Sequence, residues 1–157
     1  MDALLEAIGN WPGAVVLRDS GTAYLFVNAA HILGIGLVLG AILPLDLRLL
    51  GLFQQAPLPV LGPFLSRAAA VGVALAILTG LWLFSVNVSD YVGNPAFLAK
   101  LALLALALGN VALQHGPGGF GAAVASGTVP PLARLLAALS AVLWLSVLVA
   151  GRWIGFL

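Results

Sequence analysis

The sequence contains no cysteine, and its 157 residues include one methionine and few charged residues. Without cysteine there is no disulfide framework, no thiolate metal site and no cysteine nucleophile. Charged residues make up 7% of the chain, far below the roughly 25% of a typical soluble domain. The formal net charge of +1 comes without the basic stripe of a nucleic-acid-binding surface, so no nucleic-acid partner is expected.

Catalytic motifs are also missing from the sequence. It has no nucleophile with a base beside it, no paired carboxylates and no phosphate-binding loop, so hydrolase and kinase functions have no support. What the chain has in abundance is apolar side chains, which make up 62% of it and raise the mean hydropathy to +1.17. Lipid is therefore the expected surrounding of most of the chain.

Four apolar runs are each close to the length of about 20 residues that a helix needs to cross the hydrocarbon core of a bilayer. They cover residues 22–44, 60–87, 95–115 and 131–152. Lipid offers the backbone no hydrogen bonds, so long apolar runs without alternating polarity predict helices rather than barrel strands. We therefore predict an all-α integral membrane four-helix bundle that forms a single domain over residues 1–157.

The segment before the first run predicts a short interfacial helix over residues 2–9, broken by "GNWPG", with Trp11 at headgroup depth. Four spans place both termini on the same side of the membrane. The six basic residues divide equally between the two faces, so they do not orient the chain. The acidic residues gather on the face with the termini, and this favours a periplasmic position for that face.

Titratable residues inside apolar spans are costly, so each is a candidate functional residue. At about 1.5 Å per residue from the face with the termini, His31 lies about 14 Å deep, Thr79 about 12 Å and Lys100 about 8 Å. His115 lies about 30 Å deep, so one metal or haem should not be held between the two histidines. A lysine side chain can bridge the difference in depth to His31, and Lys100 is therefore its candidate partner.

Small and polar neighbours surround His31 on its helix. Asn28 and Gly34 lie three residues to either side, on the His31 face, where Asn28 offers a hydrogen-bond partner and Gly34 leaves room beside the ring. Gly36 and Gly40 form a GxxxG pair on the other side of the helix. We expect that side to pack closely against another helix, and it is a plausible homodimer face.

Each candidate has a structural alternative. His31 fits a histidine that hydrogen-bonds two helices as well as it fits a ligand. Lys100 either takes part in a site or extends to the nearby interface, and Arg152 either reaches inward or extends to lipid headgroups. Thr79 and Gly80 are interpreted as a point of close helix packing.

Two further polar pairs lie at the ends of spans. Asp46 and Arg48 are expected to pair at the membrane interface, on the face opposite the termini. Asn94 and Pro95 predict a helix start, with the asparagine as N-cap and the proline at the first helical position.

The chain resembles a family of small bacterial inner-membrane proteins without an assigned function, in the stretches "VNAAHILGIGLVLGAILPLDLRLLG", "TGLWLF", "NPAFLAKLALLALALGN" and "GRWIGF". This resemblance implies a multi-pass protein of the bacterial inner (plasma) membrane. More distantly, the layout is similar to CopD-like copper-resistance membrane domains and to HemJ-type protoporphyrinogen oxidases. In the latter, a histidine that ligates haem b, an arginine after the first helix and a lysine on the third recur, and the matching positions are His31, Arg48 and Lys100.

Three functions follow from these observations, and they leave open whether the protein is an enzyme. The first is haem b binding for redox or porphyrin chemistry, with His31 as iron ligand, Lys100 as second ligand or propionate partner, and Asn28, Arg48 and Arg152 as further cofactor-binding residues. The second is transport of copper or a small solute, although Cu(I) prefers thiolate and thioether ligands, which this chain lacks apart from one methionine. The third is a structural subunit of a membrane complex.

Overall fold

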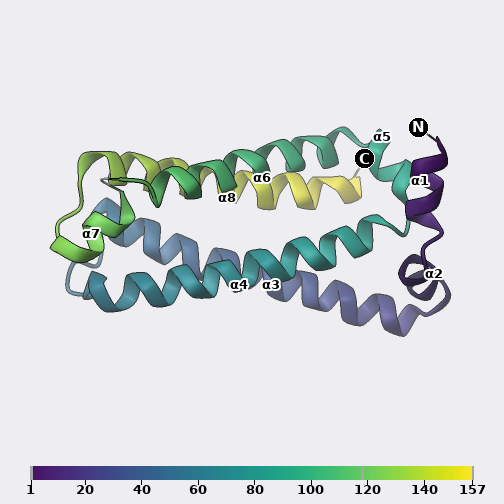
Figure 1. Cartoon of the computed structure of the whole chain (residues 1–157), viewed down its shortest axis with the longest axis horizontal. Coiled ribbons are helices and arrows are strands. Elements are labelled where there is room, and N and C mark those ends of the chain that lie inside the picture. The colour runs from purple at the N-terminus through teal and green to yellow at the C-terminus, as the bar shows by residue number, and fades with distance from the viewer. Residues whose placement is uncertain (1, 118, 157) are drawn as a thin grey trace.

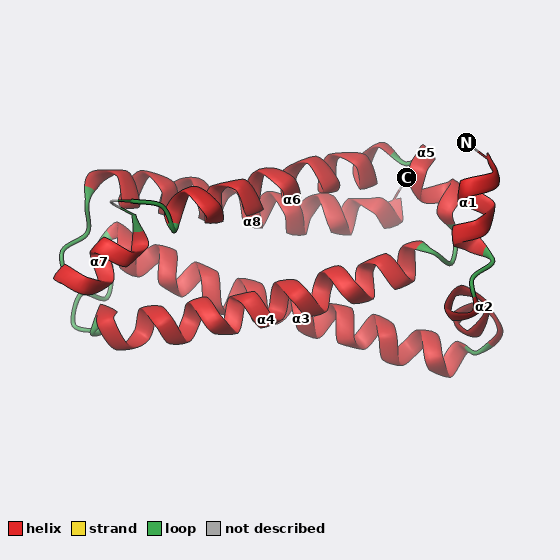
Figure 2. Ribbon diagram, in the orientation of Figure 1, coloured by secondary structure: helices red, strands yellow, loops and turns green. Residues whose placement is uncertain are grey.

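The computed structural model describes residues 2–117 and 119–156, and this part of the chain folds into helices and loops without a strand (Figures 1 and 2). Four helices are long and apolar enough to cross a membrane. They are α3 (Gly21–Leu50), α4 (Leu58–Phe84), α6 (Pro95–Gln114) and α8 (Pro131–Trp153). The predicted all-α membrane bundle is confirmed, and the architecture fits a multi-pass membrane protein.

Short helices cover the two ends of the bundle (Figure 1). The terminal end holds α1 (Asp2–Gly9), α2 (Pro12–Asp19), α5 (Val88–Gly93) and, after α8, the 3-10 turn η1 (Ile154–Phe156). The loop end holds the α3–α4 connection, residues 51–57, and α7 (Phe120–Ser126). The short N-terminal helix agrees with expectation. The sequence does not indicate α2, α5 and α7, because helices this short depend on packing rather than on periodicity.

The long helices form two layers, α3 with α4 and α6 with α8 (Figure 1). Helix α8 also packs against α3 and so joins the layers. Helix α4 meets α6 through the stacked rings of Phe84 and Phe97, whose centroids lie 5.3 Å apart.

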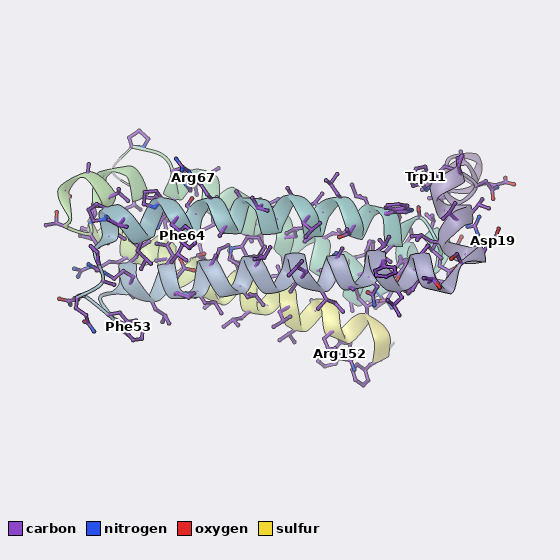
Figure 3. The ribbon with its side chains drawn as sticks, turned by 90° about the horizontal axis from the view of Figure 1, so that it is seen from below. Trp11, Asp19, Phe53, Phe64, Arg67 and Arg152 are labelled. Atoms are coloured by element: carbon purple, nitrogen blue, oxygen red, sulfur yellow. The ribbon has the colours of Figure 1, made fainter. Side chains whose placement is uncertain are left out.

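The terminal end is tied to α4 by two tryptophans. The Trp11 indole N–H donates to Ser85 Oγ over 2.9 Å, and the Trp82 N–H donates to the Gly13 carbonyl, also over 2.9 Å. The two rings lie 6.1 Å apart. Figure 3 places Trp11 and Asp19 at one end of the molecule and Phe53 at the other. Trp11 thus lies at the end of the bundle, where an interfacial tryptophan is expected.

Helix α3 continues well past Pro44, where the predicted span ended. A proline keeps a helical φ and removes one N–H, and it does not prevent the later turns from forming their own hydrogen bonds. The helix ends at Gly51, which has a φ of 104° that only glycine adopts readily.

Helix α6 begins as predicted, with Asn94 Oδ1 accepting from the backbone N–H of Ala96 (3.0 Å) and Phe97 (3.2 Å).

Asp46 and Arg48 do not form the expected pair. The Arg48 guanidinium donates from Nε to the Ala56 carbonyl (2.8 Å) and from Nη2 to the Gln54 carbonyl (3.2 Å), so it holds the α3–α4 loop. Asp46 is buried, and its Oδ2 has no hydrogen-bond partner within the described residues. Residues two apart on a helix point in nearly opposite directions, about 200° apart, which separates the two charges.

Close packing of α3 against α4 occurs at Gly34 and Gly72. A Cβ at Gly34 would lie 2.8 Å from the Ala76 backbone nitrogen, and a Cβ at Gly72 would lie 2.8 Å from the Val38 nitrogen. Gly34 therefore serves helix packing and does not simply leave room beside His31.

The Gly36 and Gly40 face has no neighbour within the described chain. A Cβ at either glycine would meet nothing within 4 Å. No helix of the described chain therefore covers this face, and its close packing against another helix, as in a homodimer, stays a prediction.

Gly34→Ala should destabilise the protein by about 1–3 kcal/mol, because the added methyl group meets backbone atoms that can move only if α4 moves. The matched control, Gly36→Ala, adds the same methyl group to an open surface and should change stability by about 1 kcal/mol or less. Free energies of unfolding, measured by denaturing titration of the detergent-purified protein, test the pair. Equal effects of the two substitutions would contradict the proposed packing role of Gly34.

Candidate functional site

His31 lies on α3 with its ring against α4, and its environment selects one tautomer. The ring Nδ1 is 3.0 Å from Thr79 Oγ1. The Thr79 hydroxyl is 2.6 Å from the Leu75 carbonyl, which accepts its only proton. Thr79 therefore accepts from His31, and the Nδ1–H is the donor. In the neutral ring Nε2 is then unprotonated and keeps a free lone pair, which is the form that binds metals.

Gly80 provides the surface on which the ring rests. A Cβ at this position would lie 3.0 Å from His31 Cε1 and 3.5 Å from Nδ1. Any larger residue would push the ring away from the Thr79 hydroxyl. The adjacent Thr79 and Gly80 thus act together, since one orients the imidazole and the other makes room for it.

Lys100 reaches the same region from α6. Its side chain lies across Gly151 of α8, where a Cβ would be 3.4 Å from Cε and 3.5 Å from Nζ. The Lys100 ammonium is near enough to act electrostatically on the His31 ring. The Lys100 side chain is partly buried, and so it does not extend freely to the membrane interface. All four long helices contribute to this region, which we call the His31 site: His31, Thr79, Gly80, Lys100 and Gly151.

Asn28 is partly buried one turn before His31, but the imidazole donates its hydrogen bond to Thr79. Arg48 lies at the loop end, about 25 Å along α3 from His31, with its guanidinium bonded to loop carbonyls. Arg152 is exposed, with its guanidinium 4.6 Å from the centre of the Phe156 ring, and it extends away from the bundle in Figure 3. Among the predicted site residues within the described chain, His31 and Lys100 are near enough to interact electrostatically.

His115 lies in a separate environment from His31. It follows the last residue of α6, its Nδ1 is 2.9 Å from the Val111 carbonyl, and its Nε2 is 3.5 Å from Ser66 Oγ. Its ring also contacts Phe120, with centroids 5.3 Å apart. The two histidines are thus at different levels of the bundle, as the depth count predicted.

Sequence analysis placed Thr79 within about 2 Å of the depth of His31 but interpreted Thr79 and Gly80 as close helix packing. It therefore missed both residues as neighbours that orient the imidazole. A hydroxyl at the level of a buried titratable ring is the signal that could have identified this partner. In the described part of the chain no three His, Cys, Asp or Glu residues are grouped to hold a metal, so any metal at this site depends on His31.

The comparisons with known proteins identify a family without identifying an activity. A family model described as "Family of unknown function (DUF6644)" matches residues 9–157. No curated protein and no solved structure matches the chain. The expected similarity to an uncharacterised family is therefore confirmed, and the similarity to CopD-like and HemJ-type proteins gains no support.

Thr79→Val should destabilise the protein by about 1–3 kcal/mol, because it removes the acceptor and leaves the His31 N–H buried without a partner. Thr79→Ser keeps the hydroxyl, and losing one methyl group should cost about 1 kcal/mol. Unfolding of both variants in detergent, followed by tryptophan fluorescence, measures the difference. If serine is no better than valine, the hydroxyl does not orient His31.

Proposed function

The chain belongs to the family of unknown function DUF6644, and we propose that it binds haem b within the membrane, with His31 Nε2 as the atom that would hold the iron. The observation that carries this proposal is the hydrogen bond from His31 Nδ1–H to Thr79. A metal-ligating histidine typically donates its second ring nitrogen to a fixed acceptor, which sets the tautomer and the orientation of the ring. The Thr79 hydroxyl is such an acceptor.

The residues around His31 fit a haem in two further respects. The imidazole is partly buried rather than sealed in the core. The amine of Lys100 is near enough to act electrostatically on the ring, and it would serve either as a second ligand or as the partner of a propionate. Bundle cores of this kind are frequent cofactor sites.

Haem bound here would supply one-electron redox chemistry or the binding of a small ligand. The chain's own residues supply the setting for that chemistry. Thr79 keeps the proton on Nδ1, and Gly80 leaves room for the ring beside it. Arg48 has no part in this proposal, because its donors are engaged by the loop at the opposite end.

The proposed location is the inner membrane of a bacterium, with the terminal end in the periplasm. Glu6, Asp19 and Asp90 lie at the terminal end, in or beside α1, α2 and α5. Acidic residues are tolerated in translocated segments, whereas cytoplasmic loops favour lysine and arginine. Fusion of a periplasm-dependent reporter to the C-terminus tests this orientation.

Protein purified in detergent from cells with adequate haem supply should show a Soret absorption band that His31→Ala abolishes. His115→Ala is the matched control, because this histidine lies elsewhere in the bundle, and it should retain the band. Absorption spectra of equal amounts of folded protein, confirmed by size-exclusion chromatography, make the comparison. A colourless protein with His31 intact, or an unchanged band in His31→Ala, would exclude the proposal and favour a structural role.

A further inference from the structure

The two ends of the bundle expose different charges. Acidic side chains are exposed at the terminal end, and these are Glu6, Asp19 and Asp90. At the loop end Arg67 and Arg134 are exposed, whereas Asp46, the acidic residue toward this end of the described chain, is buried. The loop end therefore presents positive charge without an exposed carboxylate beside it in the described part of the chain.

Arg67 lies at the level of the membrane at which α6 ends. Helices α4 and α6 are joined near both ends, by the stacked rings of Phe84 and Phe97 and by Ser66 Oγ, which lies 3.5 Å from His115 Nε2. On each helix these contacts are 18 residues apart, from 66 to 84 and from 97 to 115. That length spans about 27 Å, close to the roughly 30 Å of a hydrocarbon core. Ser66 and Arg67 are therefore at the edge of the core, where lipid phosphates begin.

Ser66 and Arg67 present hydrogen-bond donors at this level. Arg67 is exposed and projects from the edge of α4 in Figure 3. His115 Nδ1–H donates to the Val111 carbonyl over 2.9 Å, which holds the imidazole beside Ser66. The 3.5 Å contact between that ring and the Ser66 hydroxyl is at the long limit of a hydrogen bond, so the hydroxyl is held weakly. A guanidinium binds phosphate through two parallel N–H···O bonds, and the serine hydroxyl adds a donor.

Toward the middle of the membrane, the same face of α4 is apolar. Val71 lies one turn after Arg67 and Leu78 lies three turns after it, so the three residues fall within about 40° around the helix. Val71 is 62% exposed and Leu78 is 69% exposed. A phosphate bound at Arg67 and an acyl chain lying along Val71 and Leu78 would occupy this face together. A free phosphate would use only its charged end.

We propose that Ser66 and Arg67 bind the phosphate group of an anionic phospholipid in the leaflet at the loop end. Charge complementarity selects the headgroup. Phosphatidylglycerol brings a net negative charge to a surface that exposes arginine, and basic residues at this depth are typical of sites for anionic lipids. Phosphatidylcholine also brings a cation, for which this end of the described chain has no exposed carboxylate. The lipid site is separate from the His31 site and does not depend on haem binding.

The test adds phosphatidylglycerol or phosphatidylcholine with identical acyl chains to protein purified in an uncharged detergent, and it follows thermal unfolding. A ligand that binds the folded state raises the melting temperature in a concentration-dependent way. We expect a saturable rise with phosphatidylglycerol and a smaller one with phosphatidylcholine. Arg67→Gln should lower the affinity for phosphatidylglycerol about tenfold, because charge-assisted hydrogen bonds are lost. Arg134→Gln is the matched control, since it removes an exposed arginine at the same end from α8, and it should respond as the wild type does.

Native mass spectrometry of the same samples counts the lipid molecules that each variant retains, and this readout does not depend on unfolding. Wild-type protein and Arg134→Gln should retain phosphatidylglycerol, whereas Arg67→Gln that elutes as a folded species should lose it. The proposal is wrong if both lipids bind equally, or if Arg67→Gln binds as the wild type does. Equal losses in Arg67→Gln and Arg134→Gln would also overturn it, because the loop end then attracts anions without a site. If inorganic phosphate gives the same rise in melting temperature, the ligand is a free phosphate and the lipid proposal is wrong.

Discussion

The close approach of α3 and α4 at Gly34 and Gly72 is the constraint on which the rest of the structure depends. A Cβ at Gly34 or at Gly72 would lie within 3 Å of backbone atoms of the facing helix, so only glycine permits this separation. His31 lies one turn before Gly34, and Thr79 lies two turns after Gly72. Because threonine is short, its hydroxyl meets the imidazole only when the helices are this near. The orientation of His31 is therefore a consequence of helix packing more than of any residue beside it on α3.

Polar groups within the bundle are divided into two sets with different chemistry. The His31 site, toward the terminal end, contains nitrogen donors and acceptors and draws on all four long helices. The second set lies toward the loop end, where the buried amides of Asn110 and Gln114 on α6 donate to carbonyls of α8. Helix α8 takes part in both, and it is also the helix that joins the two layers. A change in its position would therefore affect both sets of residues.

The family resemblance and the structure give Arg48 two different roles. The resemblance makes it a candidate for cofactor binding, whereas its geometry explains the α3–α4 loop. Both of its hydrogen bonds go to carbonyls that no helix satisfies, and an unpaired carbonyl near a membrane is costly. Because Arg48 is engaged there, it does not pair with Asp46. The buried Oδ2 of Asp46 has no hydrogen-bond partner in the described part of the chain.

Apolar length and composition determined the four membrane helices, the depths of His31 and His115, and the start of α6 at Asn94 and Pro95. These are local properties, set by hydrophobic runs, rise per residue and capping chemistry. Only the tertiary structure decided that Gly34 and not Gly36 packs against a helix, that Thr79 and not Asn28 bonds to His31, and that Arg48 bonds to loop carbonyls and not to Asp46. Periodicity shows which residues share a face, but a glycine-containing face looks the same in sequence whether lipid or a helix covers it. The covering helix is chosen by packing among segments far apart in the chain.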